Sequence, residues 1–194
     1  MQDSKINIRY AVEADAFTIA SVHITSWQKI YRGHIPDAIL DKLSIEKRTQ
    51  MWRDLIGKGI KVLVLENEKK IIGFTSICPS RDSDSRLKQC GEISAIYLHP
   101  DFWHQGLGKK LCSSALGELK SGGYSEVILW VLKENMQARQ FYESMGFMLD
   151  ENEKIDNLNA CTLGVIVGEE ATENVNIPVH EVRYYKSLKW RSTY

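Results

Sequence analysis

Residues 100–110 read Pro-Asp-Phe-Trp-His-Gln-Gly-Leu-Gly-Lys-Lys, and this stretch decides the fold. The preceding segment, Glu92–Leu98, has the pattern of a β-strand that stops at Pro100. After the stretch, apolar side chains follow a helical period from Leu107 until Gly122-Gly123 ends the helix. A helix N-terminus leaves backbone N–H groups unpaired and carries partial positive charge, and glycines let an anion approach it closely. The arrangement therefore favours a pyrophosphate site.

The glycine-rich turn is also open to other interpretations. A Gly-x-Gly pair also fits a helix that uses glycine only to turn the chain. The dinucleotide-binding pattern needs a third glycine, but that position holds Leu111. The P-loop needs glycine where Trp103 stands and Ser or Thr where Lys110 stands. Neither of these two nucleotide motifs is present.

The rest of the chain predicts a mixture of helices and strands. Val127–Leu132 is six consecutive apolar residues, which is typical of a strand buried on both faces. Because helices and strands are segregated around the central segment, the pattern indicates an α/β (α+β) fold and not a doubly wound sheet. The other expected strands are Ile6–Tyr10, Lys61–Glu66, Lys70–Ile77 and Glu181–Lys186, and the other expected helices are Asp15–Ile30, Asp41–Ile56 and one from Asn135 to Gly146.

The chain length fits one domain, so residues 1–194 are expected to form a single unit. No element is predicted between Asp150 and Val179, where residues 168–178 are polar and resemble a flexible insertion, and residues 187–194 are expected to form a tail.

Composition excludes several function classes. Twenty-five basic residues balance 25 acidic ones, so no global positive field indicates a nucleic-acid partner. No apolar run approaches the roughly 18 residues of a membrane helix, and the N-terminus lacks an apolar signal core, so we expect a cytoplasmic protein without a membrane partner. The four cysteines form no Cys-x-x-Cys pair, and no metal is expected.

Residues 92–147 resemble the CoA-binding core of the GNAT family of acetyl-CoA-dependent N-acetyltransferases. That family has Arg/Gln-x-x-Gly-x-Gly/Ala after a strand and, further along, Asn-x-x-Ala-x-x-Phe-Tyr-x-x-x-Gly-Phe. The second motif is present in full, as Asn135, Ala138, Phe141, Tyr142, Gly146 and Phe147. The first motif departs at one position, because Trp103 stands where the family has Arg or Gln.

The resemblance implies a GNAT fold, a mixed central sheet flanked by helices with acetyl-CoA at the splay between two central strands. It places the pantetheine arm along Ile96, Tyr97 and Leu98, with backbone hydrogen bonds from Ile96 and Leu98 and a further bond from Asn135. By the same resemblance, Trp27 and Tyr31 roof the acceptor site, although core packing is an alternative for both. The residues expected to wrap the pyrophosphate are His104, Gln105, Gly106, Leu107, Gly108 and Lys109.

Two residues are candidates for the chemistry of direct acetyl transfer to a primary amine. The Tyr142 phenol, protonated at neutral pH, would donate a proton to the departing thiolate, unless it is only a packing residue. Glu92 would deprotonate the amine if partial burial raises its pKa; the alternatives are ordered water as base and a solvated strand-end charge. The expected enzyme is an N-acetyltransferase acting on a small molecule or peptide. The competing hypothesis is an acyl-CoA-binding sensor without turnover, and the choice between monomer and homodimer stays open.

Overall fold

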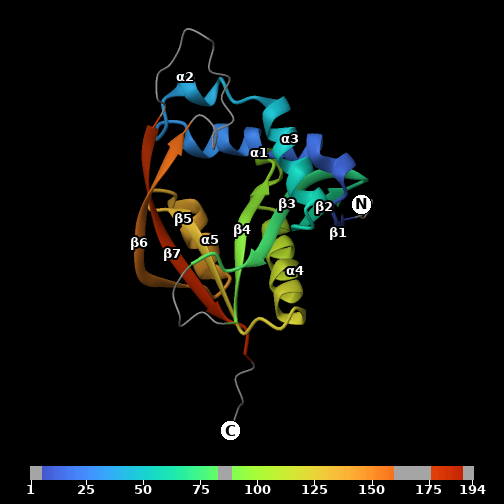
Figure 1. The fold of residues 1–194 in the computed structure, drawn as a ribbon, viewed down its shortest axis with the longest axis vertical. Helices are drawn as coiled ribbons and strands as arrows, with labels where there is room; N and C mark the ends of the chain where they lie inside the picture. The colour runs from blue at the N-terminus through green and yellow to red at the C-terminus, as the bar shows by residue number, and fades with distance from the viewer. Residues whose placement is uncertain (1–5, 83–88, 160–175, 190–194) are drawn as a thin grey trace.

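The computed structural model describes residues 6–82, 89–159 and 176–189. Figure 1 shows a sheet with helices packed against both of its faces. The helical elements are η1 (Glu13–Asp15), α1 (Ala16–Tyr31), α2 (Asp37–Leu40), α3 (Ile45–Gly57), η3 (Pro100–Phe102), α4 (Leu107–Ser121) and α5 (Met136–Ser144). The strands are β1 (Ile6–Tyr10), β2 (Lys61–Asn67), β3 (Lys70–Pro79), β4 (Cys90–Leu98), β5 (Glu126–Leu132), β6 (Met148–Asn159) and β7 (Asn176–Ser187).

The strands form one mixed sheet in the order β1-β2-β3-β4-β5-β7-β6. Every neighbouring pair is antiparallel except β4 and β5, which run parallel. This confirms the mixed α/β prediction. Apolar side chains of α4 and α5 pack on one face of the sheet, against β5 residues such as Val127 and Leu129. Helices α1 and α3 cover the opposite face of β2 and β3, where Trp52 and Phe74 lie in a second core cluster.

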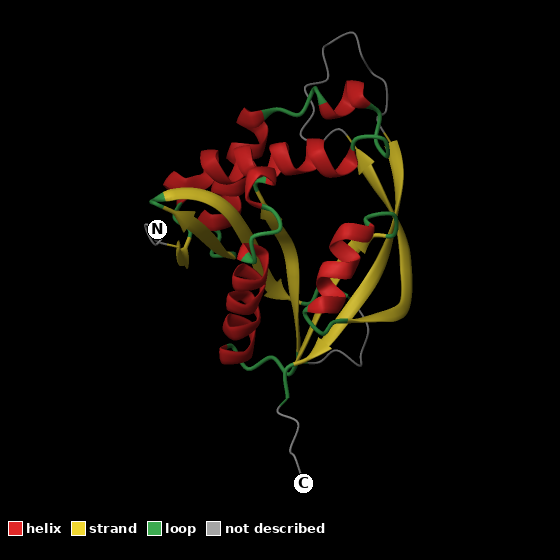
Figure 2. Cartoon of the chain, turned by 180° about the vertical axis from the view of Figure 1, so that it is seen from behind, coloured by secondary structure: helices red, strands yellow, loops and turns green. Residues whose placement is uncertain are grey.

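The two central strands separate partway along their length. Pairing between β4 and β5 covers only Cys90 with Glu126, Gly91 with Val127 and Glu92 with Ile128. Beyond these pairs the strands diverge, which Figure 2 shows as an opening between them. On its other side β4 stays paired with β3, but Ser94 is an extra residue between Ile93 and Ala95 in the register. Such a bulge bends a strand, so it contributes to turning β4 away from β5.

Two expectations about element boundaries were wrong. The helix expected over Asp41–Ile56 begins only at Ile45, as α3, because Ser44 caps it by accepting a hydrogen bond from Lys47 N at 3.2 Å; the short α2 precedes the expected range.

The stretch for which the sequence predicts no element contains β6 and the start of β7, and residues 176–178 of the expected flexible insertion belong to β7. The β6 sequence is mostly polar and exposed, so its alternation is weak, and pairing with β7 supplies its hydrogen bonds. The remainder of the expected insertion and residues 190–194 of the expected tail lie outside the described residues.

Candidate active site

The glycine-rich turn forms the N-terminus of α4. Gly106 is the N-cap residue and has a left-handed φ of 75°, which glycine adopts without steric cost. The amide of Lys110 donates to Gly106 O at 3.3 Å. The amides of Leu107, Gly108 and Lys109 precede that first helical bond, so they have no intrahelical acceptor. The turn therefore presents a row of N–H donors at the positive end of a helix dipole, as an anion requires.

A groove of about 620 Å³ runs from this turn along the diverging part of β4 to α5. The structure brings together along it most of the residues predicted to hold a cofactor. Those that line the groove are Ile96, Tyr97, Leu98, His104, Gly106, Gly108, Lys109 and Asn135, with Tyr142 at its inner end. Two predicted residues do not line it. Gln105 is exposed and donates to Asp101 O at 3.1 Å, and the Leu107 side chain is buried in the core.

Trp103, which departs from the motif of the family that the sequence resembles, is held against the end of β4. The indole Nε1 donates to Leu98 O at 2.6 Å, and Ser26 Oγ donates to the same oxygen at 3.1 Å. Both lone pairs of this carbonyl therefore have protein partners. The indole hydrogen bond holds the end of β4 against the turn. A ligand that donates to the Leu98 carbonyl would have to compete with these two donors.

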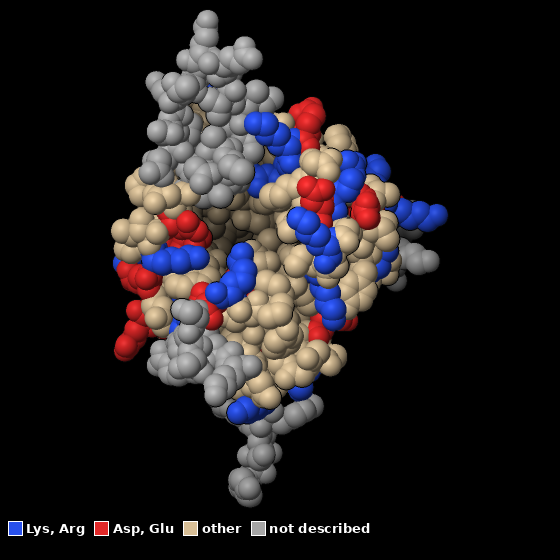
Figure 3. Space-filling view, viewed as in Figure 1, with Lys and Arg blue, Asp and Glu red and all other residues tan. Residues whose placement is uncertain are grey.

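A second cleft, of about 740 Å³, extends from the divergence toward α1 and α3. It shares Ile96, Tyr97, Asn135, Ala138 and Tyr142 with the groove, so the two hollows meet between β4 and α5. On the face shown in Figure 3, the surface is hollowed between the charged side chains over β6 and β7 and those nearer the N-terminal helices.

The predicted acceptor residues Trp27 and Tyr31 both line this second cleft. Their rings meet edge to face at a centroid distance of 4.8 Å. Trp27 Nε1 donates to the Tyr97 hydroxyl at 2.9 Å, and Tyr97 lines the same cleft. The cleft therefore has a rigid aromatic wall that carries two phenol groups.

Tyr142 lies on α5 at the junction of the two hollows. Its side chain is 7% exposed, and burial raises the pKa of its phenol far above the ordinary value. The phenol is thus protonated at neutral pH. Asn135 starts the helix that carries it, because Asn135 Oδ1 accepts from Ala138 N at 3.1 Å. The Asn135 side-chain carbonyl is committed to this cap, while its NH₂ group is left for a ligand in the groove.

Glu92 lies on the acceptor side of the sheet, but not at this junction. Its carboxylate is only 2% exposed and is held by Arg81, through Arg81 N at 3.1 Å, Nε at 3.2 Å and a close contact from Nη2. It lines a side cavity of about 350 Å³ that shares Arg81, Ser94 and Trp130 with the acceptor cleft. The role of Glu92 as base stays a prediction; Arg81 contacts both of its carboxylate oxygens.

Sequence reasoning missed Glu181, which lines both the acceptor cleft and the side cavity. It is the first residue of the segment predicted as the last strand, and nothing in its local pattern distinguishes it from a solvated charge. Only the placement of β7 beside β5 brings it to the cleft.

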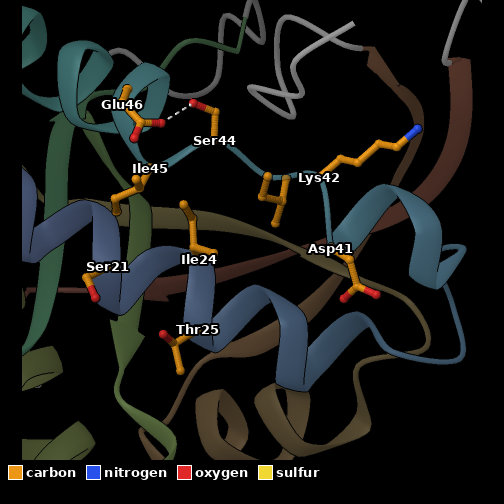
Figure 4. Close-up of a pocket in the computed structure, with 9 residues that line it drawn as sticks. Ser21, Ile24, Thr25, Asp41, Lys42, Ser44, Ile45 and Glu46 are labelled. Carbon is orange, nitrogen blue, oxygen red and sulfur yellow. Dashed lines mark hydrogen bonds between the residues drawn. The ribbon is translucent and has the colours of Figure 1, made fainter. Parts of the chain in front are cut away.

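Another surface depression, of about 570 Å³, lies on the outer side of α1 (Figure 4). Ser21, Ile24 and Thr25 form one wall and residues 41–46 the other, and Ser44 Oγ donates to Glu46 at 2.9 Å. None of the predicted site residues lines it. Within the described ranges, no cluster of three or more His, Cys, Asp or Glu side chains could hold a metal ion, and no helix is long and apolar enough to cross a membrane.

Comparison with known proteins agrees with this geometry. The chain is 32% identical over 131 residues to the uncharacterized N-acetyltransferase YuaI of Bacillus subtilis, covering 67% of this chain and 73% of that protein. It is 27% identical over 147 residues to the L-amino acid N-acyltransferase MnaT of Escherichia coli, covering 74% and 80% respectively.

Among solved structures, the PaiA N-acetyltransferase of Thermoplasma acidophilum in complex with coenzyme A superposes with a TM-score of 0.70 at 20% identity. The match covers 94% of this chain and 99% of that one, so the two share a fold. The model of the acetyltransferase (GNAT) family matches residues 25–147, which include β4, the glycine-rich turn and α5. The chain therefore belongs to the GNAT family of acetyltransferases.

Proposed function

We propose that this acyltransferase moves an acetyl group from acetyl-CoA directly to the primary amine of a small molecule, with Tyr142 as the general acid. The observation that carries the proposal is the meeting of two hollows at Tyr142. One has the features of a cofactor groove, and the other is a separate cleft with an aromatic wall. Direct transfer needs both substrates present at once, and two clefts that join at a proton donor suit that requirement.

The groove fits CoA on two independent grounds. The first-turn amides of α4 can bind the pyrophosphate, where Gly108 keeps the backbone approachable. The edge of β4 beyond Glu92 is not paired with β5, so Ile96 can offer backbone hydrogen bonds to the pantetheine arm. Asn135 can donate to the same arm through its NH₂ group. When bound, acetyl-CoA supplies an activated thioester at the inner end of this groove.

The chain's own contribution to the chemistry centres on a proton at the Tyr142 oxygen. Loss of the thiol leaves negative charge on sulfur, and a buried, protonated phenol can donate to it. The hydroxyl makes no hydrogen bond to another described residue, so its proton is not committed elsewhere in that part of the protein.

The size of the acceptor cleft favours a small molecule over a peptide. Its volume of about 740 Å³ falls within the range of about 300–1,000 Å³ of small-molecule sites. Trp27, Tyr31 and Tyr97 wall it, and aromatic faces attract a protonated amine through cation–π contacts. The relative MnaT is named as acting on L-amino acids, which supports including such compounds among the acceptors tested.

The test is release of free thiol from acetyl-CoA with L-methionine, a linear diamine and a tripeptide with a free N-terminus, with the acetylated product identified by mass spectrometry. Preferential acetylation of the amino acid or the diamine supports the proposal, while preference for the tripeptide moves the acceptor class to peptides. The competing sensor hypothesis predicts that CoA binds and raises the melting temperature but that none of the amines is acetylated.

A further inference from the structure

We propose that Glu181 on β7 is the carboxylate that binds the acceptor ammonium and removes its proton. This inference rests on the proposed function and adds the amine side of the reaction to it. Glu181 lines both the acceptor cleft and the side cavity behind it. Among the acidic residues that the structure describes, it is the one that lines the cleft whose other end holds Tyr142.

The fold directs Glu181 toward the cleft through the register of two strand pairs. Glu181 lies opposite Leu132 of β5 and opposite Lys154 of β6. Val179, two residues earlier, packs with Tyr31 and Leu132 in a buried cluster. Because alternate residues of a strand share a face, Glu181 lies on the same side of the sheet as Tyr31. The side chain is 22% exposed, so it is open to a ligand in the cleft while shielded from bulk solvent.

The phenols of Tyr31, Tyr97 and Tyr142 line the same cleft as Glu181. The Glu181 charge contributes to raising the pKa of Tyr31 and Tyr97, after the larger effect of burial. An amine bound in this cleft would thus share one cavity with a carboxylate and with the protonated Tyr142.

Glu181 is better suited than Glu92 to accept a proton. Three contacts from Arg81 occupy both oxygens of Glu92. Glu181 has one ion pair, to Lys154 at 3.2 Å, and the Lys154 side chain is 39% exposed and also lies over the Trp130 ring. A flexible lysine at the surface leaves a carboxylate oxygen available, whereas a bidentate guanidinium does not.

The proton balance of the step is complete. The ammonium nitrogen gives one proton to the Glu181 carboxylate, and its lone pair then forms the C–N bond with the acetyl carbonyl. The C–S bond breaks, and Tyr142 gives its proton to the leaving thiolate. The nitrogen of the new C–N bond still carries two protons; one returns to the Tyr142 oxygen, the other stays as the amide N–H, and Glu181 releases its proton to solvent. No oxidant, reductant or metal is required.

Titratable and charged groups from the neighbouring elements surround the Glu181 carboxylate. These groups are Tyr31 of α1, Arg81 after β3, Glu92 and Tyr97 of β4, and Lys154 and Asp156 of β6.

The experiment compares Glu181→Gln, Lys154→Gln and the control Glu153→Gln, using the amine that the wild type acetylates. Glu153 is also a carboxylate of this sheet, but it is exposed and bonded to Lys133 and His180, and it lines neither cavity. We expect Glu181→Gln to lower kcat/KM for the amine by on the order of 10²-fold or more, with CoA affinity unchanged. Glu153→Gln should match the wild type.

The Lys154→Gln variant separates catalysis from structure. If Glu181 is the base, losing the lysine should keep the activity and move the acidic limb of the kcat/KM profile to higher pH, because the carboxylate loses a neighbouring cation. Full activity of Glu181→Gln would overturn the proposal. So would equal losses of melting temperature and activity in Glu181→Gln and Lys154→Gln, since these would reveal a purely structural ion pair. A wild type that binds CoA and acetylates none of the three amines would refute the proposed function itself, and the Glu181 assignment with it.

Discussion

Replacing Tyr142 with phenylalanine removes one oxygen from the junction of the two clefts. The ring keeps its neighbours, with centroid distances of 5.4 Å to Phe141, 5.9 Å to Phe147 and 6.3 Å to Tyr184. No hydrogen bond between the hydroxyl and another described residue is lost. The free energy of unfolding should therefore change by less than about 1 kcal/mol, which is a shift of less than about 4 °C in melting temperature for a domain of this size.

The effect on catalysis should be much larger than the effect on stability. Removing a general acid costs about 10²–10⁴ in rate, which corresponds to about 2.7–5.4 kcal/mol of transition-state stabilisation. The assay is thiol release at saturating amine, together with CoA affinity by calorimetry and a thermal melt. An acyl donor whose leaving thiol is more acidic should recover part of the loss, because that thiolate needs less help to depart.

Tyr124→Phe is the matched control for this experiment. Tyr124 is partly buried against the same core cluster but lines neither the groove nor the acceptor cleft. It should leave both stability and turnover near the wild type. Full turnover of Tyr142→Phe would refute the acid role. Unfolding of the variant, or loss of CoA binding, would show instead that the tyrosine serves the fold.

Three further substitutions test the cofactor groove, the ion pair between Arg81 and Glu92, and the stability of the fold at low pH. Gly108→Glu should abolish the CoA-dependent rise in melting temperature, because it places a carboxylate at the expected phosphate site. The control Gly108→Ala should fold normally, because the added Cβ meets only ordinary van der Waals contacts. Equal CoA affinity in wild type and Gly108→Glu would contradict this prediction. Glu92→Gln should lower the free energy of unfolding by about 1–3 kcal/mol, because Arg81 loses a charged partner. Its turnover should stay within about tenfold of wild type. A loss of turnover of about 10²-fold or more with unchanged stability would instead support Glu92 as the base. The hydrogen bond from Arg9 lowers the pKa of Asp15, so the pair contributes stability that is present above the unfolded pKa of about 3.9 and lost as the pH falls through the folded pKa. Denaturant titrations at several pH values should show the difference between wild type and Asp15→Asn shrinking below about pH 4, and a difference independent of pH would contradict the assignment.

Local sequence patterns determined many of the helices, strands and turns of this protein. The glycine-rich turn, the helical period after Leu107 and the cap at Asn135 each depend on residues within a few positions of one another, so they can be recognised in the sequence. The apolar run Val127–Leu132 is likewise a local signal, and its strand lies where predicted. These elements carry the groove and Tyr142, which is why the residues that line the groove could be grouped together from the sequence.

Tertiary structure decided the acceptor side. The divergence of β4 from β5 depends on strand pairing and on the bulge at Ser94, neither of which has a sequence signature of its own. Arg81 reaches Glu92 from the segment that follows β3, and Glu181 reaches the cleft only because β7 inserts between β5 and β6. Contacts between residues far apart in the chain depend on which strands pair and in what register. A single polar residue such as Glu181 therefore looks the same in the sequence whether it faces solvent or a substrate.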